Sequence, residues 1–104
     1  MGDFYVKVHY VEVGGLIEKI VAICDKELIG KKYEEGDLQL YVNPRFYGGE
    51  EMSEEEILDA IENATIINLV GEKSVSLGLK LGIVLEENII RIANIPHAQV
   101  VVMV

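Results

Sequence analysis

Apolar and polar residues alternate with a period of two over residues 4–12, which read FYVKVHYVE. One face would carry Phe4, Val6, Val8 and Tyr10, and the other Tyr5, Lys7 and His9. This alternation predicts a half-buried β-strand. Gly14-Gly15 separates it from a second apolar run, residues 16–24, and a Gly-Gly pair supplies the positive φ angles of a tight turn. We therefore predict a β-hairpin.

The following segment, residues 25–37, is polar and contains two glycines. It is typical of a connection, with a short helical turn near residues 26–30. A third strand is predicted at residues 38–42. We expect Asn43-Pro44 to end it, because proline lacks a donor for the strand ladder and asparagine favours turns. Residues 45–50 (RFYGGE) are then expected to form a loop.

The clearest helix pattern covers residues 53–63. Ser53 can cap the helix, and Glu56 three positions later completes a capping box. Met52 and Ile57 have the spacing of a hydrophobic staple. Glutamates fill the first turn, where the helix dipole favours negative charge.

The rest of the chain predicts three strands and a second helix. The strands are expected at residues 65–70, 89–93 and 98–104. Residues 72–82 fit two structures, because their apolar side chains alternate as in a strand and yet also share one helical face with Val70 and Ser74. We favour a helix ending at Gly82, since it fits between the neighbouring strands.

These elements predict a single α+β domain over residues 1–104. Strands outnumber helices and begin as a hairpin, which favours a two-layer sandwich with a mostly antiparallel or mixed sheet and two main helices. The last five residues carry neither charge nor proline. We expect this terminal strand to lie inside the sheet or against a second subunit, because such a segment aggregates when exposed at an edge.

Charge narrows the choice of partner. The chain has 9 Lys and Arg against 18 Asp and Glu, a formal charge of −9, and its cations are spread along the sequence. Nucleic acid and anionic membranes are disfavoured, because both are bound through clustered cations. A basic protein partner is compatible with this charge, although surplus carboxylates also serve solubility alone. Without a signal peptide or a membrane-spanning apolar run, we expect a cytoplasmic protein.

Several motifs together resemble one known family. They are Cys24–Gly30 (CDKELIG), Glu35–Asp37 (EGD), Asn43–Glu50 (NPRFYGGE), Asn68–Val75 (NLVGEKSV) and Ile95–Gln99 (IPHAQ). Taken over nearly the whole chain, they are similar to a family of short archaeal proteins known only as domain of unknown function number 424. The resemblance implies an archaeal cytoplasmic origin and supports the two-layer sandwich. It carries no activity, cofactor or catalytic residue over to this chain.

One candidate ligand site joins the 45–50 loop to His97. In that loop Arg45 can hold a carboxylate or phosphate, Tyr47 offers a hydroxyl, and Gly48 and Gly49 allow close approach of the backbone. Glu50 and His97 would complete the site. The alternative is an ordinary loop whose aromatic side chains fill the core, with His97 donating to a nearby carbonyl, and that alternative is favoured.

A second candidate is an anion site at Gly71, Lys73 and Ser74. A strand–glycine–helix junction can bind an anion through free backbone N–H groups. The segment lacks the first glycine and the Gly-Lys order of a nucleotide-binding phosphate loop.

The other reactive side chains predict little chemistry. Cys24 is the only cysteine and has apolar neighbours, so we expect a buried thiol. No general signature supports Cys24 as a nucleophile beside His97, and His9 is expected to face solvent. Two histidines and one cysteine without ligand spacing predict neither a metal site nor a cofactor.

Residues 50–62 hold a run of carboxylates without a cation. Such a run is usually a solvated helix face, and a functional one would dock a basic protein. We therefore favour a non-catalytic interaction module that uses this acidic helix and the aromatic loop, and a translation-apparatus partner is a guess from charge and the archaeal resemblance. The alternatives are a small enzyme or anionic-ligand-binding protein using the 45–50 loop and His97, and a homo-oligomer formed through the C-terminal strand.

Overall fold

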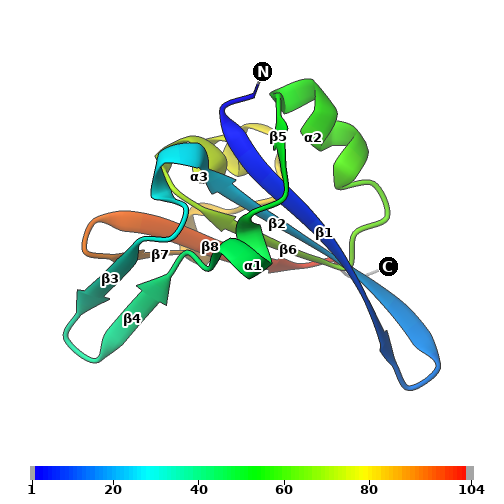
Figure 1. Ribbon diagram of the computed structural model, residues 1–104, viewed down its shortest axis with the longest axis horizontal. Coiled ribbons are helices and arrows are strands. Elements are labelled where there is room, and N and C mark those ends of the chain that lie inside the picture. Colours follow the sequence, from blue (N-terminus) through cyan, green and yellow to red (C-terminus); the bar gives the residue numbers. More distant parts are fainter. Residues whose placement is uncertain (1, 103–104) are drawn as a thin grey trace.

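A six-stranded sheet forms the centre of the molecule, with a separate two-stranded hairpin beside it (Figure 1). The computed structural model describes residues 2–102. The large sheet has the strand order β5-β1-β2-β6-β8-β7. Its strands are β1 (Phe4–Val13), β2 (Leu16–Asp25), β5 (Glu50–Met52), β6 (Ile66–Val70), β7 (Ile89–Ile92) and β8 (Ile95–Val101). All neighbouring strands are antiparallel except β2 and β6, which are parallel, so the predicted mixed sheet is confirmed.

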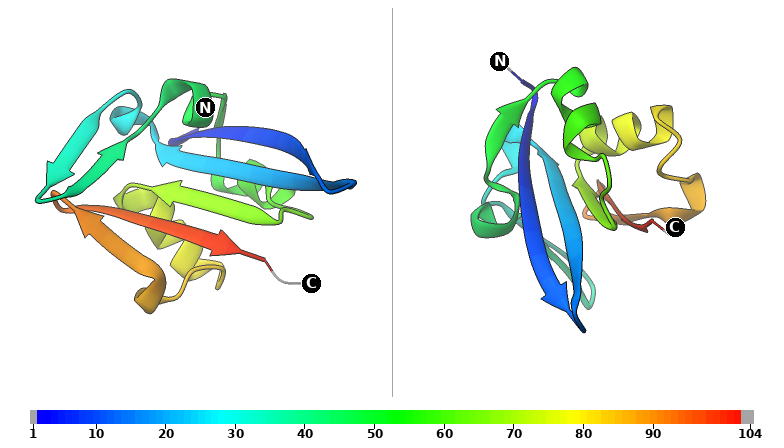
Figure 2. Two further views of the ribbon diagram at one scale, coloured as in Figure 1. Left: turned by 90° about the horizontal axis from the view of Figure 1, so that it is seen from below. Right: turned by 90° about the vertical axis from the view of Figure 1, so that its right-hand side faces the viewer.

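Two different layers cover the two faces of this sheet (Figure 2). On one face, which we call the helix side, the helices α2 (Glu54–Ala60) and α3 (Glu72–Lys80) pack over a core of aliphatic residues that includes Val6, Ile23 and Leu69. On the other, the α1 side, the short helix α1 (Pro44–Tyr47) and the hairpin β3–β4 enclose a smaller core around Cys24 and Val70. The predicted α+β class with two main helices is therefore confirmed, and α1 with the β3–β4 hairpin covers the second face of the sheet in addition to the two layers that were predicted.

The predicted N-terminal hairpin is present with the predicted faces. Phe4 pairs with Asp25 and Val13 with Leu16, and Gly14 and Gly15 both have positive φ in the two-residue turn. Two glycines suit this turn because side chains are disfavoured at positive φ.

The predicted capping box of α2 is also present. The Ser53 hydroxyl accepts from the N–H of Glu56, and the Glu56 carboxylate accepts from the N–H of Ser53. The ambiguous segment 72–82 is the helix α3, and Gly82 follows it with positive φ. The three predicted later strands correspond to β6, β7 and β8, although residues 103–104 lie outside the described part of the chain.

Two segments differ from the prediction. Residues 25–37 were expected to connect strands, but Lys32–Glu35 is the strand β3, which pairs with β4 (Leu38–Tyr41) across a Gly36-Asp37 turn. The expected helical turn is present as a 3-10 turn at Lys26–Leu28. β3 is mostly exposed and polar, so it lacks the alternation from which a strand can be predicted.

The expected loop over residues 45–50 is also wrong. Asn43 caps α1 by accepting from the N–H of Arg45, and Pro44 occupies the first turn. Asn-Pro therefore begins a helix here as well as ending a strand. Glu50 then starts β5, which pairs with the beginning of β1.

β8 lies inside the sheet for part of its length. Only His97 and Ala98 pair with both β6 and β7. β7 extends only as far as the level of Ala98, so Gln99–Val101 has a neighbour on the β6 side alone. Association through this free edge remains a prediction. Within residues 2–102, no helix combines the length and apolar character needed to cross a membrane.

Candidate functional site

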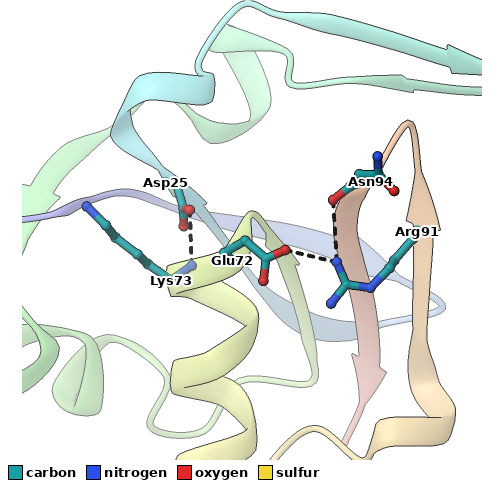
Figure 3. Close-up of polar contacts among 5 residues, drawn as sticks. All are labelled: Asp25, Glu72, Lys73, Arg91 and Asn94. Carbon is teal, nitrogen blue, oxygen red and sulfur yellow. Dashed lines mark hydrogen bonds and ion pairs between the residues drawn. The ribbon is translucent and has the colours of Figure 1, made fainter.

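The junction between β6 and α3 is built around the carboxylate of Asp25. Because β2 and β6 are parallel neighbours, the end of β2 lies beside Gly71, which links β6 to α3. Oδ1 of Asp25 accepts from the N–H of Ser74 at 2.8 Å and from its hydroxyl at 2.7 Å. Oδ2 accepts from the N–H of Lys73 at 3.1 Å, the bond drawn in Figure 3. Asp25 thus caps α3 from another strand, in place of the N-cap Gly71, which has no side chain.

This arrangement changes the predicted anion site at Gly71, Lys73 and Ser74. The backbone donors that would receive a phosphate already hold a carboxylate of the chain itself, and Asp25 is only 3% exposed. Gly71 has a φ of 110°, and a Cβ there would collide with the carboxylate of Asp25. The close approach of the Asp25 carboxylate therefore explains why residue 71 is a glycine. An external anion at this junction would have to displace that carboxylate.

A second polar group ties α3 to the β7–β8 turn. Arg91 Nη1 lies 2.9 Å from Glu72 Oε1 and donates to the carbonyl of Asn94 at 3.4 Å (Figure 3). On the other side of the same turn, the N–H of Ala93 donates to Glu35 Oε1 at 2.8 Å. Glu35 thereby attaches the β3–β4 hairpin to the main sheet, a contact that the sequence pattern did not indicate.

Residues 45–50, which were predicted to form a loop with a ligand site, are integrated into the fold as part of α1 and the start of β5. Tyr47 is 5% exposed in the α1-side core, where burial raises the pKa of its hydroxyl above the ordinary value and the neighbouring Cys24 adds to the shift. A Cβ on Gly48 would collide with the Pro44 carbonyl oxygen, and one on Gly49 would collide with that of Val6. Both glycines are required by close contacts of the backbone. Arg45 and Glu50 remain exposed.

His9 is half-buried, so the prediction that it faces solvent is wrong. Its ring stacks on Phe46 with 4.8 Å between ring centroids, and its Nε2 lies 2.8 Å from the Phe46 carbonyl oxygen. Next to it, Lys7 Nζ donates to the Arg45 carbonyl at 2.8 Å. These two bonds fix α1 on β1.

His97 lies within β8 rather than at a strand end. It stands between Val70 of β6 and Ile90 of β7, and its Nε2 is buried without a hydrogen-bond partner among the described residues. The expected bond to a carbonyl is therefore absent at this nitrogen. Desolvation lowers the pKa of His97, so the ring is held neutral.

Cys24 and His97 are not arranged as a nucleophile and a base. Val70 lies between them in the same row across the sheet, so two strand spacings, roughly 10 Å, separate their backbones. The Cys24 thiol is fully buried, and burial, with a smaller effect from Asp25, raises its pKa to about 12. The thiol is therefore protonated at neutral pH.

One cavity on the helix side contains a predicted residue. It has a volume of about 270 Å³ and is lined by Lys73, Ser76 and Lys80 of α3 together with Asp3 and Glu54. Lys80 Nζ lies 3.5 Å from Glu54 Oε2. The spacing of Lys73, Ser76 and Lys80 places them on one helical face, a signal present in the sequence, yet only Lys73 was predicted. A second cavity of about 170 Å³ follows the β3–β4 hairpin.

The structure thus separates the predicted site residues. Tyr47 and His97 lie on the α1 side but line neither cavity, whereas Lys73 lines the helix-side cavity. Ser74 and Gly71 belong to the Asp25 cap. Among residues 2–102, no group of three or more His, Cys, Asp or Glu side chains is arranged to hold a metal ion.

Comparison with known proteins gives a family and a fold. Residues 16–103 match the family model described as "Protein of unknown function (DUF424)". The chain is also similar to the crystal structure of an uncharacterized conserved protein from Methanopyrus kandleri, with 22% sequence identity and a TM-score of 0.73 over 97% of this chain and 94% of that one. No curated protein matches the chain. At this identity the similarity to the solved structure establishes the fold alone.

Proposed function

The chain belongs to the DUF424 family of proteins of unknown function, and from its surface we propose that it is a non-catalytic module that binds a basic protein partner through α2. Of the two surfaces expected from the sequence, the proposal keeps the acidic helix and excludes the aromatic loop. Phe46 and Tyr47 are engaged with His9 and the α1-side core, so the aromatic loop is a poor docking surface. The acidic helix α2 remains available as the docking surface.

The observation that carries the proposal is a group of exposed carboxylates on and after α2, which we call the acidic face: Glu55, Asp59 and Glu62. None of the three has an ion-pair partner among residues 2–102, whereas the neighbouring Glu54 pairs with Lys80. Glu56 is engaged differently, because its bonds to Ser53 lower the pKa of its carboxyl.

The spacing of the acidic face has an energetic consequence. Glu55 and Asp59 are four residues apart, so they lie next to each other on the helix. Like charges at this spacing destabilise a helix by about 0.2–0.5 kcal/mol. A partner that presents lysine or arginine would remove this repulsion and gain charge-assisted hydrogen bonds. The charge of the chain and its resemblance to an archaeal family motivate a basic component of the translation apparatus as this partner.

The test is titration of the protein with a labelled oligolysine peptide, followed by amide chemical shifts. Binding should shift the amides of α2 and weaken with added salt. The triple variant Glu55→Gln/Asp59→Asn/Glu62→Gln should weaken it several-fold. The matched control, Glu34→Gln/Glu86→Gln/Glu87→Gln, removes as much charge from exposed sites elsewhere and should have a smaller effect. Equal losses in the two variants would contradict a specific acidic face.

A second candidate function, binding of a small anionic ligand, is favoured by one observation. The cavity beside α3 brings Lys73 and Lys80 together with the hydroxyl of Ser76, whereas Asp3 and Glu54 oppose an anion there. Titration with inorganic phosphate should then shift the amides of residues 73–80. Shifts that are absent from the wild type, or that persist in Lys73→Ala/Lys80→Ala, would count against this candidate.

A further inference from the structure

The N-terminal hairpin extends well beyond the rest of the sheet. β1 and β2 each contain ten residues, but β5 pairs only with residues 4–6 of β1, and β6 pairs only with residues 20–24 of β2. Residues 10–19, which we call the arm, therefore form a two-stranded ribbon, visible at the lower right of Figure 1 and at the bottom of the right-hand view of Figure 2. Lys19 lies at its base, where the Lys19 carbonyl accepts from the N–H and the hydroxyl of Thr65, and the rest of the arm projects beyond this contact.

The arm exposes an unusual amount of apolar surface. Five large apolar side chains in it are between 42% and 70% exposed: Tyr10, Val11, Val13, Leu16 and Ile17. Scattered apolar side chains are normal on a protein surface, but several large ones gathered on one short ribbon indicate a binding surface. An isolated two-stranded ribbon is also only marginally stable in water, so a covering partner would stabilise the arm.

The two faces of the arm have different surroundings. Tyr10 lies opposite Lys19, and Ile17 lies opposite Glu12, so these side chains continue the helix side of the sheet, where Val8 packs into the core. Lys19 Nζ donates to the carbonyl of Glu62 at 2.6 Å. Val11, Val13 and Leu16 lie on the α1 side. Tyr10 and Ile17 therefore adjoin the end of the acidic face, and the other three do not.

Charge indicates what would cover this surface. Glu12 lies opposite Ile17, and Glu62, the last residue of the acidic face, is held beside the arm by its backbone bond to Lys19, the cation on this side of the arm. A second copy would bring the same carboxylates together between chains that each have a formal charge of −9. A segment that combines cations with apolar side chains complements both features of the surface.

We propose that Tyr10 and Ile17 are the apolar anchors of the interface that begins on the acidic face, and that the partner presents a basic amphipathic segment. This inference rests on the proposed function and extends it. Surface carboxylates alone contribute little binding energy, because exposed ion pairs are screened by solvent. Tyrosine and other large side chains that become fully desolvated supply most of the energy of typical interfaces.

The test uses two synthetic peptides of the same lysine and leucine composition, each long enough for about five helical turns. In one, the leucines lie along a single helical face, and in the other they are shuffled. The arm variant is Tyr10→Thr/Ile17→Thr, and the matched control is Val13→Thr/Leu16→Thr on the opposite face. Threonine keeps the β-propensity of the strands, and amide spectra of each variant establish that the fold is intact.

We expect the amphipathic peptide to bind more tightly than the shuffled one. Tyr10→Thr/Ile17→Thr should weaken this binding by about tenfold or more, whereas Val13→Thr/Leu16→Thr should change it by less than about twofold. If both arm variants bind as the wild type does while the α2 triple variant does not, the arm proposal is wrong and the proposed function stands. If the wild-type protein binds neither peptide, both the arm proposal and the proposed function are wrong.

Two further outcomes would overturn the arm proposal alone. Equal losses in the two arm variants would show that the helix side has no special role. A wild-type dimer in light scattering that dissociates in Tyr10→Thr/Ile17→Thr would show that a second copy covers the arm.

Discussion

Asp25 and Ser74, which belong to different elements, are joined by two short hydrogen bonds to one carboxylate oxygen, from the backbone N–H at 2.8 Å and from the hydroxyl at 2.7 Å. Both residues are buried. The pair fixes the start of α3 against the end of β2 and places an internal anion where a helix N-terminus attracts one. The N-terminus of α3, which resembles an anion-binding site in the sequence, is therefore occupied by a carboxylate that stabilises the fold.

Replacing Asp25 tests this role. Asp25→Ala should lower the free energy of unfolding by about 2–3 kcal/mol, because it removes the cap of α3 and leaves Ser74 and the N–H of Lys73 without their acceptor. Asp25→Asn keeps one acceptor oxygen, so its free energy of unfolding should fall by less. Urea unfolding measures the difference. Glu55→Ala, at an exposed carboxylate, should remain within about 0.5 kcal/mol of wild type. A similarly small effect of Asp25→Ala would show that the cap does not stabilise the fold.

The two glycines at the ends of α3 provide a matched comparison. Gly71→Ala should cost about 3 kcal/mol or more, since its Cβ would both strain a positive φ and collide with the Asp25 carboxylate. Gly82 also has a positive φ, but no atom lies within 4 Å of a Cβ built there, so Gly82→Ala should cost only about 1 kcal/mol. Equal losses in denaturant unfolding would mean that the contact with Asp25 contributes nothing to the need for Gly71.

His97 predicts a specific pH dependence. Its folded pKa lies below the ordinary value of 6.5, so as the pH falls through about 6.5 the unfolded chain takes up a proton that the folded chain resists. The stability that depends on a neutral His97 is therefore fully present above that pH and is lost as the pH falls below it. His97→Leu should be at least as stable as wild type at pH 7, because it removes a buried nitrogen without a partner, and it should lose less stability between pH 7 and 5. If the free energy of unfolding of wild type and of His97→Leu changes with pH in the same way, the pH dependence does not come from His97.

Cys24 should be almost inert in the native protein. With a pKa of about 12, its thiolate fraction at pH 8 is roughly 10³-fold below that of an ordinary cysteine, and burial blocks access as well. Alkylation by iodoacetamide, followed by mass spectrometry, should therefore be fast only in denaturant, where the same single cysteine serves as the positive control. Rapid labelling of the folded protein would contradict the burial of this thiol.

Local patterns predicted the parts of the fold that depend on local physics. The alternation in β1, the Gly14-Gly15 turn and the capping box at Ser53 each specify an element through neighbouring residues. Asn43-Pro44 was interpreted as the end of a strand and is also the start of α1, because the same residue types serve both purposes. β3 and β5 are short and largely polar, and their structure depends on the strands with which they pair.

The candidate site was harder to predict because it depends on strand order. Asp25 meets Ser74 only because β2 and β6 are neighbours, and no residue pattern near either position indicates that pairing. The same topology places Val70 between Cys24 and His97. The exposure of Tyr10 and Ile17 likewise follows from the short lengths of β5 and β6, whereas the sequence alone shows an ordinary alternating strand.

The most direct test of the interaction account compares two labelled ligands of opposite charge, a basic amphipathic peptide and single-stranded or duplex RNA of similar length, by fluorescence anisotropy at low and moderate salt. The account predicts that wild-type protein binds the peptide, that salt weakens this binding, and that RNA is not retained, because the surface of α2 and the arm is anionic. Tight, salt-sensitive binding of RNA with no binding of the peptide would contradict it.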